Sequence, residues 1–369
     1  IYVIEFFYSN KLKIKVDLSI PFFLFLMLIV SIISGLSEFS TIYSFDDFLK
    51  FTLVVLFPFL ACYIYIYREV NFLPDYYKFI FISAIVGIIQ FVGAALDITW
   101  LYDFRIYGMQ ISNVDKVSGF LRVYSFFREP FYLGFFYIPI IYAIFYNKIY
   151  NSNLCKSNNF SDLIILIVFL LTFSSVAYVG MVIVFLSVFF VNIKFRFTTV
   201  IYFLIFSILL FLILNSQFQV VEKLFSLFDD GKLYQSGSVF AFVSNYEIIK
   251  NNLTELMFFG VGFNHYYELY DNNIYLLFDK LYMDIKLNRV DGANMANRLI
   301  GEFGVLFFFL SCVLLLTRFI CNVKSPITHL YFVSLLVFSL RNGSYHEPIF
   351  LIFLSGFLIS TMKSRNSFI

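Results

Sequence analysis

The chain alternates between long apolar runs and short polar segments, and most of the apolar runs have the length of a membrane span. A transmembrane helix needs about 17–25 predominantly apolar residues. The pattern predicts spans at 20–36, 48–67, 76–96, 129–146, 162–175, 177–193, 197–214, 299–317, 326–340 and 348–362. A polar break, "TFSS" at 172–175, leaves open whether the pair at 162–193 is two helices or one kinked helix. The pattern therefore predicts an all-α polytopic membrane protein with about ten to eleven transmembrane helices. We expect residues 1–369 to form a single integral membrane domain.

The composition agrees with a chain that is surrounded by lipid. Of the 369 residues, 61% are hydrophobic and 14% are charged, whereas soluble domains are about 45–50% apolar and about 25% charged. A net charge of +2 gives no indication of a nucleic-acid partner. The four Cys contain no CxxC pair and the three His contain no HExxH motif, so we expect neither a metal site nor a cofactor.

Basic residues in the short loops predict which side of the membrane each loop faces, because cytoplasmic loops are enriched in Lys and Arg. Lys11, Lys13 and Lys15 precede the first complete span and predict that its start is cytoplasmic. Alternation brings the other basic short-loop residues to the same side: Arg68, Lys148, Lys156, Lys194, Arg196, Arg318, Lys324, Lys363 and Arg365. The N-terminal basic segment and the C-terminus are therefore both predicted to be cytoplasmic.

Two connections, 97–128 and 215–298, are much longer than the rest and face outward in this topology. Long loops in compact proteins are uncommon and often functional. The second one has apolar residues at 239, 242, 243, 246 and 249, which is the spacing of a helix. The stretch "FFGVGFNHYY" that follows indicates a glycine turn. We expect the two loops to form a cap over an active site.

Two similar stretches, "RVYSFFREPF" from Arg122 and "RNGSYHEPIF" from Arg341, lie where the chain re-enters the membrane from outside. Pro at the first helical position and a Glu beside it suit a helix N-terminus, and the charge stabilises it by about 0.3–1 kcal/mol. This role explains Glu129 and Glu347 about as well as a catalytic role does. His346 lies next to Glu347, which is also the arrangement of a general base and its orienting group.

Arginines gather on the outward side, where basic residues are disfavoured. They are Arg105, Arg122, Arg128, Arg289, Arg298 and Arg341. A planar guanidinium binds phosphate oxygens through two parallel hydrogen bonds, which a Lys ammonium cannot do. The set therefore predicts a site for phosphate or pyrophosphate at the outer leaflet. Taken singly, each Arg is explained as well by an ion pair that fixes a loop, and His265 by an ordinary hydrogen bond.

The arrangement resembles that of the O-antigen polymerases and the related O-antigen ligases. The likeness lies in the span count, in a large outward loop before the last three spans, and in short motifs. These are "LLTFSS" ahead of a span, "FFGVGF" in the loop and "NRLIGEFGVLFFF" at the start of the next span. In architecture the resemblance covers most of the chain.

Two finer patterns bear on the choice between the relatives. The ligases resemble one another in a His-Asn followed by Glu-x-Gly; here Glu302 begins "EFG" and Asn294 matches the Asn, but Ala293 stands at the position of the His. This difference argues against a ligase. The polymerases are described with an Arg followed by a Gly in each of two outward loops.

The two Arg–Gly pairs of this chain are Arg122 with Gly134 and Arg289 with Gly301, each one residue longer than the polymerase pattern. Their placement, one pair in each outward loop, is similar to that of the family.

The resemblance implies a metal-independent membrane glycosyltransferase of lipopolysaccharide or other surface polysaccharide biosynthesis. It would polymerise lipid-linked O-antigen repeat units at the periplasmic face of the bacterial inner membrane, by transferring the growing glycan from undecaprenyl (polyprenyl) pyrophosphate to a new lipid-linked unit. Its partners would be the polyprenyl-pyrophosphate-linked oligosaccharide, membrane lipids and a chain-length regulator protein. Two alternatives stay open: an O-antigen ligase, and a flippase or other transporter of lipid-linked sugar.

This chemistry suggests roles for the outward residues. A pyrophosphate leaving group needs fixed cations, for which the candidates are Arg122, Arg128, Arg289 and Arg341. A general base near the acceptor hydroxyl needs a carboxylate or imidazole, for which the candidates are Glu129, Glu347 and His346. The candidates for substrate binding are His265, Asn294 and Arg298.

Overall fold

A computed structural model of the protein describes residues 49–68, 72–109, 114, 116–117, 119–155, 158–191, 237–274 and 288–366. Several predicted features lie outside the described residues: the spans at 20–36 and 197–214, the basic residues at 11–15, 156 and 194–196, and parts of the loop at 215–298. The chain divides into two compact units, which we describe separately. Unit 1 comprises Ile1–Glu69, Gly231–Asn322 and Ser339–Ile369, and unit 2 comprises Val70–Asp230 and Val323–Phe338.

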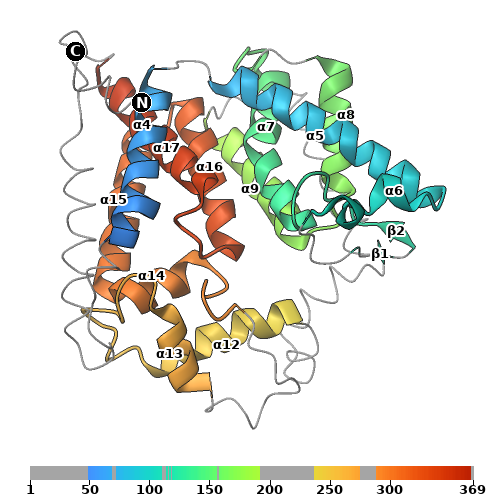
Figure 1. The fold of residues 1–369 in the computed structure, drawn as a ribbon. Coiled ribbons are helices and arrows are strands. Elements are labelled where there is room, and N and C mark those ends of the chain that lie inside the picture. Colours follow the sequence, from blue (N-terminus) through green and yellow to red (C-terminus); the bar gives the residue numbers. More distant parts are fainter. Residues whose placement is uncertain are drawn as a thin grey trace. The chain divides into compact units, whose positions relative to one another are not determined.

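Unit 2 is a group of helices with a small hairpin. Its helices are α5 (Phe72–Ala95), α6 (Thr99–Tyr102), the 3-10 turn η2 (Phe104–Tyr107), α7 (Pro130–Tyr150), α8 (Asn159–Leu170), α9 (Ser175–Val191) and most of α16 (Pro326–Arg341). The antiparallel strands β1 (Lys116–Val117) and β2 (Phe120–Leu121) lie between η2 and α7. α7 packs against α5, α8 and α9, and most of its residues are buried (Figure 1).

Unit 1 combines helices from the two ends of the described chain. They are the π-helical turn η1 (Thr52–Leu56), α4 (Phe57–Arg68), α12 (Gly237–Asn251), α13 (Tyr266–Asn273), α14 (Met295–Phe303), α15 (Val305–Cys321) and α17 (Pro348–Asn366). α4 and α17 lie side by side, and α12, α13 and α14 contact one another. Figure 1 shows these last three helices gathered at one end of α4, α15 and α17.

The described residues are mostly helical, and most of the helices are apolar. α5 and α7 are each long and apolar enough to cross a membrane. At about 1.5 Å per residue they match or exceed a hydrocarbon core of about 30 Å. Shorter apolar helices occupy Leu49–Tyr65, Asn159–Leu170, Ser175–Phe189, Val305–Cys321, Pro326–Arg341 and Pro348–Met362. Within the described residues, each predicted span therefore overlaps an apolar helix, and two of these helices have the length of a full span.

One face of α5 and one face of α15 expose large apolar side chains. On α5 they are Phe79, Ile82, Ile85, Ile89 and Val92, each 41–54% exposed. On α15 they are Leu306, Phe309, Leu310, Val313, Leu316 and Ile320, each 40–66% exposed. Residues three or four positions apart share one face of a helix, so each set forms a continuous apolar stripe. Stripes of this kind mark contact with lipid or with another protein.

The structure corrects the predicted start of the span at 299–317. The chain forms two helices there, because Gly304 has a φ of 91° and separates the end of α14 from the start of α15. A Cβ at Gly304 would lie 2.8 Å from the backbone of Phe258, so the glycine also permits a close chain approach. The apolar helix therefore begins at Val305, and residues 299–303 belong to a separate short helix.

Two other local expectations can be compared with the structure. The polar break at 172–175 separates two helices, since α8 ends at Leu170, Phe173 has a φ of 45° and α9 begins at Ser175. The helix predicted from the spacing at 239–249 is confirmed by α12. The four cysteines are free thiols.

Candidate functional site

The candidate site is built on α14, the short helix that precedes α15. Asn294 caps its N-terminus, and the Asn294 side chain accepts a hydrogen bond of 2.8 Å from the backbone N–H of Asn297. The two residues before the cap are left-handed, with φ values of 66° at Gly292 and 64° at Ala293. For an alanine this conformation costs about 1–2 kcal/mol. The sharp turn is held in part by Asp291, whose Oδ1 accepts a hydrogen bond from the N–H of Ala293 at 3.0 Å.

The segment that follows α12 fixes α14 from another side. Val261 and Gly262 donate backbone hydrogen bonds of 2.8 and 3.0 Å to carbonyl groups in the last turn of α14. A Cβ on Gly260 would lie 2.2 Å from the carbonyl oxygen of Gly301, so this approach requires a glycine. Gly260 of "FFGVGF" therefore serves close packing against α14, whereas Gly262 has a φ of 101°.

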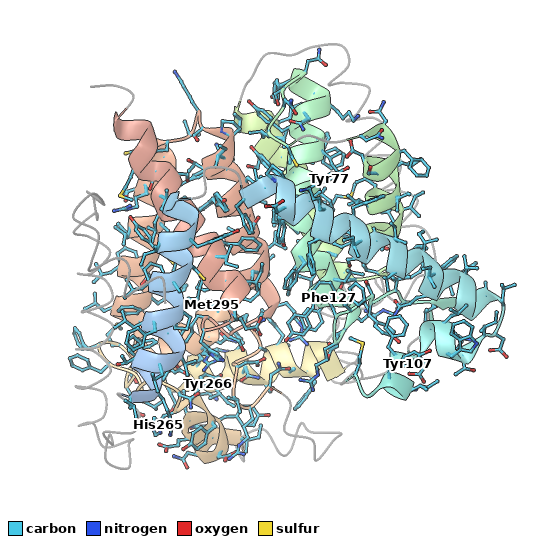
Figure 2. The ribbon with its side chains drawn as sticks, turned by 45° about the horizontal axis from the view of Figure 1, so that its top comes forward. Tyr77, Tyr107, Phe127, His265, Tyr266 and Met295 are labelled. Carbon is cyan, nitrogen blue, oxygen red and sulfur yellow. The ribbon has the colours of Figure 1, made fainter. Side chains whose placement is uncertain are left out.

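A packed core supports this part of unit 1. Tyr266 is fully buried, and its hydroxyl donates a hydrogen bond of 2.8 Å to Oδ1 of Asn245 on α12. A Cβ on Gly301 would lie 2.6 Å from the Tyr266 ring, so the ring packs directly on α14. Figure 2 shows Tyr266, Met295 and His265 on the left of the view, in unit 1.

Arg298 lies at the centre of the site, with 1% of its side chain exposed. Its Nε donates to Oε1 of Glu302, one turn later on α14, at 2.8 Å. Its guanidinium carbon lies 4.8 Å from the centre of the Tyr345 ring, which adds a cation–π contact. Longer contacts join Nη1 to the carbonyl of Gly343 at 3.4 Å and Nη2 to Oδ1 of Asn264 at 3.5 Å. The charge is thus compensated, as burial requires.

The loop 342–347, between α16 and α17, closes over this ion pair. The hydroxyl of Tyr345 donates to Oε2 of Glu302, so both carboxylate oxygens of Glu302 have a partner. A Cβ on Gly343 would lie 1.6 Å from the carbonyl oxygen of Asp291, which shows how closely the loop approaches the turn before α14. The segment before α15 and the loop before α17 therefore build one site.

His346 and Glu347 follow Tyr345 in this loop, and both are half-buried. Burial, and secondarily the charge of Arg298, lowers the pKa of His346 to about 4. The imidazole is therefore neutral at neutral pH and has a ring nitrogen that can accept a proton, but the lowered pKa makes it a weaker base than an ordinary histidine. Burial raises the pKa of Glu347, against the effect of a 3.0 Å hydrogen bond that Nδ2 of Asn342 donates to its Oε1.

Arg341, at the end of α16, lies beside the same turn. It is half-buried, and its Nη1 is 3.5 Å from the carbonyl oxygen of Ala293. The structure thus brings together five of the predicted site residues: Asn294, Arg298, Arg341, His346 and Glu347.

Two further predicted residues of unit 1, Arg289 and His265, form contacts around Tyr267. Arg289 binds Asp271 through a 2.8 Å bond from Nε to Oδ1 and a second bond from Nη2 to Oδ2, and its guanidinium carbon is 5.5 Å from the Tyr267 ring. His265 stacks on the Tyr267 ring as well, with ring centroids 5.8 Å apart, and its Nδ1 is 2.9 Å from Oε1 of Glu268. The ion pair between Arg289 and Asp271 agrees with the alternative explanation given above, in which an Arg of this set only fixes a loop.

The remaining predicted residues, Arg122, Arg128 and Glu129, belong to unit 2, on the segment between β2 and α7. Glu129 is the N-cap residue of α7 without a side-chain capping bond, and Pro130 follows at the first helical position. Arg128 is exposed, whereas Arg122 is half-buried. These residues are described separately from those of unit 1.

Sequence reasoning missed the partners of Arg298 within the site. The spacing of Arg298 and Glu302, four residues apart on a helix, is a local signal that indicates an ion pair. No local signal indicates Tyr345, because it meets Glu302 across 43 residues of chain. The same holds for Asp291, which meets Gly343 only in the fold.

No family model, no curated protein and no solved structure matches the chain. Among the described residues, no group of three or more His, Cys, Asp and Glu side chains is placed to hold a metal ion. The expected family, reaction and lack of a cofactor therefore stay predictions.

Proposed function

We propose that the protein is a polytopic glycosyltransferase of the bacterial inner membrane that polymerises lipid-linked repeat units of O-antigen or a similar surface polysaccharide. One observation carries the proposal. Basic, acidic and imidazole side chains from two distant parts of the chain, 288–303 and 341–347, converge where apolar helices end.

Lipid contact is supported by the apolar helices and their exposed stripes. Water-facing helices carry polar residues on their outer face, whereas α5 and α15 expose Phe, Leu, Ile and Val along theirs. In the proposal these stripes face acyl chains. The topology is the one expected from the Lys and Arg pattern, with the loops at 97–128 and 215–298 in the periplasm.

The position of the charged cluster suits a substrate whose head lies at the membrane surface. α16 ends at Arg341, α17 begins at Pro348, and α15 begins directly after α14. The cluster therefore lies at the ends of three apolar helices. A polyprenyl pyrophosphate has its diphosphate at this depth, and its prenyl chain lies among apolar side chains.

The proposed reaction is a transfer between two lipid-linked sugars. The oxygen of an acceptor hydroxyl on the new unit bonds to the anomeric carbon of the growing glycan. The bond from that carbon to the pyrophosphate oxygen breaks, and the polyprenyl pyrophosphate leaves with the electron pair. The acceptor proton passes to a general base, for which His346, Glu347 and Glu129 are the candidates.

Arginine side chains balance the charge of the leaving group in this proposal. Arg341 is half-buried against the turn before α14, with its Nη1 3.5 Å from the carbonyl oxygen of Ala293, which suits an electrostatic role in a site with little water. Arg289 is the other proposed pyrophosphate contact in unit 1, and Arg122 and Arg128 are proposed as separate phosphate-binding candidates of unit 2.

The distribution of ionisable residues favours this proposal over a transporter. Transporters place such residues near the middle of their spans. In the apolar helices described, the charged residues and His lie close to the ends: Lys50 in the helix Leu49–Tyr65, Arg68 in α4, Asp75 and Lys78 in α5, Lys148 in α7, Asp162 in α8, Arg318 in α15, His329 and Arg341 in α16, and Lys363 and Arg365 in α17.

Deletion of the gene, followed by electrophoresis of the surface polysaccharide, tests the proposed reaction. A polymerase predicts that the ladder of chain lengths collapses to a single repeat unit. A ligase predicts instead that long chains persist on the lipid carrier and are missing from lipid A. An unchanged ladder would exclude both transferases.

We predict that Arg128→Ala and Arg341→Ala are expressed normally but complement the deletion with single-unit glycans only. Arg→Lys should rescue poorly, because an ammonium lacks the fork that binds two phosphate oxygens. Lys250→Ala is the matched control, since it removes an exposed basic residue paired with Glu247 on α12. Normal long chains from either arginine variant would remove that residue from the site.

A further inference from the structure

The ion pair beneath the 342–347 loop has features that a simple loop anchor does not need. It is buried almost completely, with 1% of Arg298 and 0% of Glu302 exposed. Replacing a buried ion pair by apolar residues of similar volume is often neutral or stabilising. The ion pair is therefore weak evidence for a stabilising role, and its position beside His346 suggests another role.

We propose that Arg298, Glu302 and Tyr345 form a positioning device for the catalytic loop. They fix residues 342–347 against α14 and thereby set the orientation of His346 towards the substrate. The inference rests on the proposed function, because it takes this loop as part of the transfer site. It also changes the expected role of Arg298, which acts through a neighbouring residue and not by touching the substrate.

The geometry assigns a separate task to each member. Glu302 holds Arg298 in place through a 2.8 Å bond and receives the Tyr345 hydroxyl on its other oxygen. Tyr345 covers the guanidinium with its ring and so ties the loop to α14 at two points. Arg298 adds a third point through the carbonyl of Gly343. A loop tied at three points keeps the next residue, His346, in one orientation.

The device also places one fixed positive charge close to an imidazole. Arg298 disfavours a second positive charge on His346, and burial acts in the same direction as the larger effect. The other charged groups on the surrounding elements are Glu302 on α14, Glu347 in the loop, Asp291 before α14 and Arg341 at the end of α16. Arg298 keeps its charge in the ion pair with Glu302 and so acts with burial to keep His346 unprotonated.

The decisive variant replaces the whole device by apolar groups: Arg298→Met, Glu302→Leu and Tyr345→Phe together. No buried charge or buried hydroxyl of the device then lacks a partner, so the protein should still fold. The probe is diethyl pyrocarbonate, which acylates neutral imidazole, with the extent of reaction at His346 measured by peptide mass spectrometry as a function of pH.

In the wild type, labelling of His346 should stay near its plateau down to about pH 5, because its pKa is lowered to about 4. In the triple variant, the pH at which His346 labelling is half its plateau should rise, because the charge of Arg298 is gone. It should stay below the ordinary pKa of about 6.5, since the imidazole is still buried. Polymerisation should fall together with this shift. Lys250→Met, which breaks an exposed ion pair elsewhere in unit 1, should leave both measurements unchanged.

A triple variant that is folded, with wild-type labelling and wild-type polymerisation, would overturn the inference. Should the triple variant not fold, Arg298→Lys decides. It keeps the charge but loses the fork, so labelling should keep its profile while amide hydrogen exchange in 342–347 rises and polymerisation falls. Unchanged exchange and polymerisation in Arg298→Lys would equally overturn it. If the wild type does not polymerise at all, the proposed function fails, whereas labelling and exchange still report on the device.

Discussion

At the residue scale, the site shows how environment gives neighbouring side chains opposite tendencies. His346 and Glu347 are adjacent in sequence and both half-buried. Burial lowers the pKa of the first and raises the pKa of the second, so both are biased towards their neutral forms. Between them the loop offers an unprotonated imidazole and a carboxyl group that protonates more readily than usual.

We predict that His346 makes the protein less stable as the pH falls. The pKa of His346 is about 4 in the folded protein and about 6.5 in an unfolded chain. Between these values the unfolded state binds the proton and the folded state does not, so the free energy of unfolding decreases as the pH drops through this window. Thermal unfolding in detergent should show a smaller loss for His346→Gln than for the wild type. Asn251→Gln, a neutral change at an exposed residue, should lose as much thermal stability on acidification as the wild type does. Equal losses of stability in the wild type and both variants would contradict the prediction.

At the element scale, the sequence predicted helices where an apolar run or helical spacing has clear limits, as for α12. It did not predict the division between α14 and α15, because "GEFGVLFFF" reads as a polar start followed by one apolar run. The break depends on the left-handed Gly304 and on the backbone of Phe258 next to it. Such a contact between distant segments leaves no periodic signal.

The same limit applies to the candidate site. Sequence patterns selected Arg298 and Arg341 because Arg is disfavoured in loops predicted to face outward, and His346 because it lies next to Glu347. The patterns could not pair them, since Arg341 meets Ala293 across 48 residues and Tyr345 meets Glu302 across 43. The candidate residue types could thus be chosen from the sequence and their membrane side stays a prediction, whereas partners and burial follow from the fold.

In unit 2, α5 holds the segment that carries the other candidate residues. Gln90 is fully buried, and its Oε1 accepts a 2.7 Å hydrogen bond from the N–H of Ser125 while its Nε2 donates to the Ser125 carbonyl at 3.2 Å. The Ser125 hydroxyl also donates to the carbonyl of Ser83 at 2.8 Å. Ser125 has a φ of 51°, so these bonds stabilise a turn just before Arg128 and Glu129.

We predict that Gln90→Met releases this turn from α5. The backbone N–H and C=O of Ser125 would lose their partners, at a cost of about 1–3 kcal/mol for a buried polar group left unsatisfied. Hydrogen exchange in residues 122–129 should rise, and polymerisation should fall if Arg128 acts there. Ile89→Val, on the exposed apolar stripe of α5, should change neither. Exchange that stays at the wild-type level in Gln90→Met would show that other contacts hold the turn.

At the scale of the whole molecule, the proposed reaction requires the charged site and the basic short loops to lie on opposite sides of the membrane. The site residues precede the starts of α15 and α17, which follow segments predicted to face outward. Lys324, in the turn between α15 and α16, lies past the other end of α15. Positive charge in short loops is held in the cytoplasm during insertion, so this asymmetry predicts where each residue is accessible.

Cysteine labelling tests that sidedness directly. In a variant whose four native cysteines are replaced, single cysteines are introduced at exposed positions, as Lys116→Cys, Asn251→Cys, Asn151→Cys and Lys324→Cys. An impermeant maleimide should label the cysteines at 116 and 251 in spheroplasts, because both belong to the predicted periplasmic loops. Those at 151 and 324 should react only after the membrane is permeabilised. Each variant must first restore long polysaccharide chains, so that labelling reports the functional topology. Protection of the cysteine at 251 in intact spheroplasts would place α12 and the α14 site in the cytoplasm, away from any periplasmic glycan carrier, and the proposed reaction could not take place there.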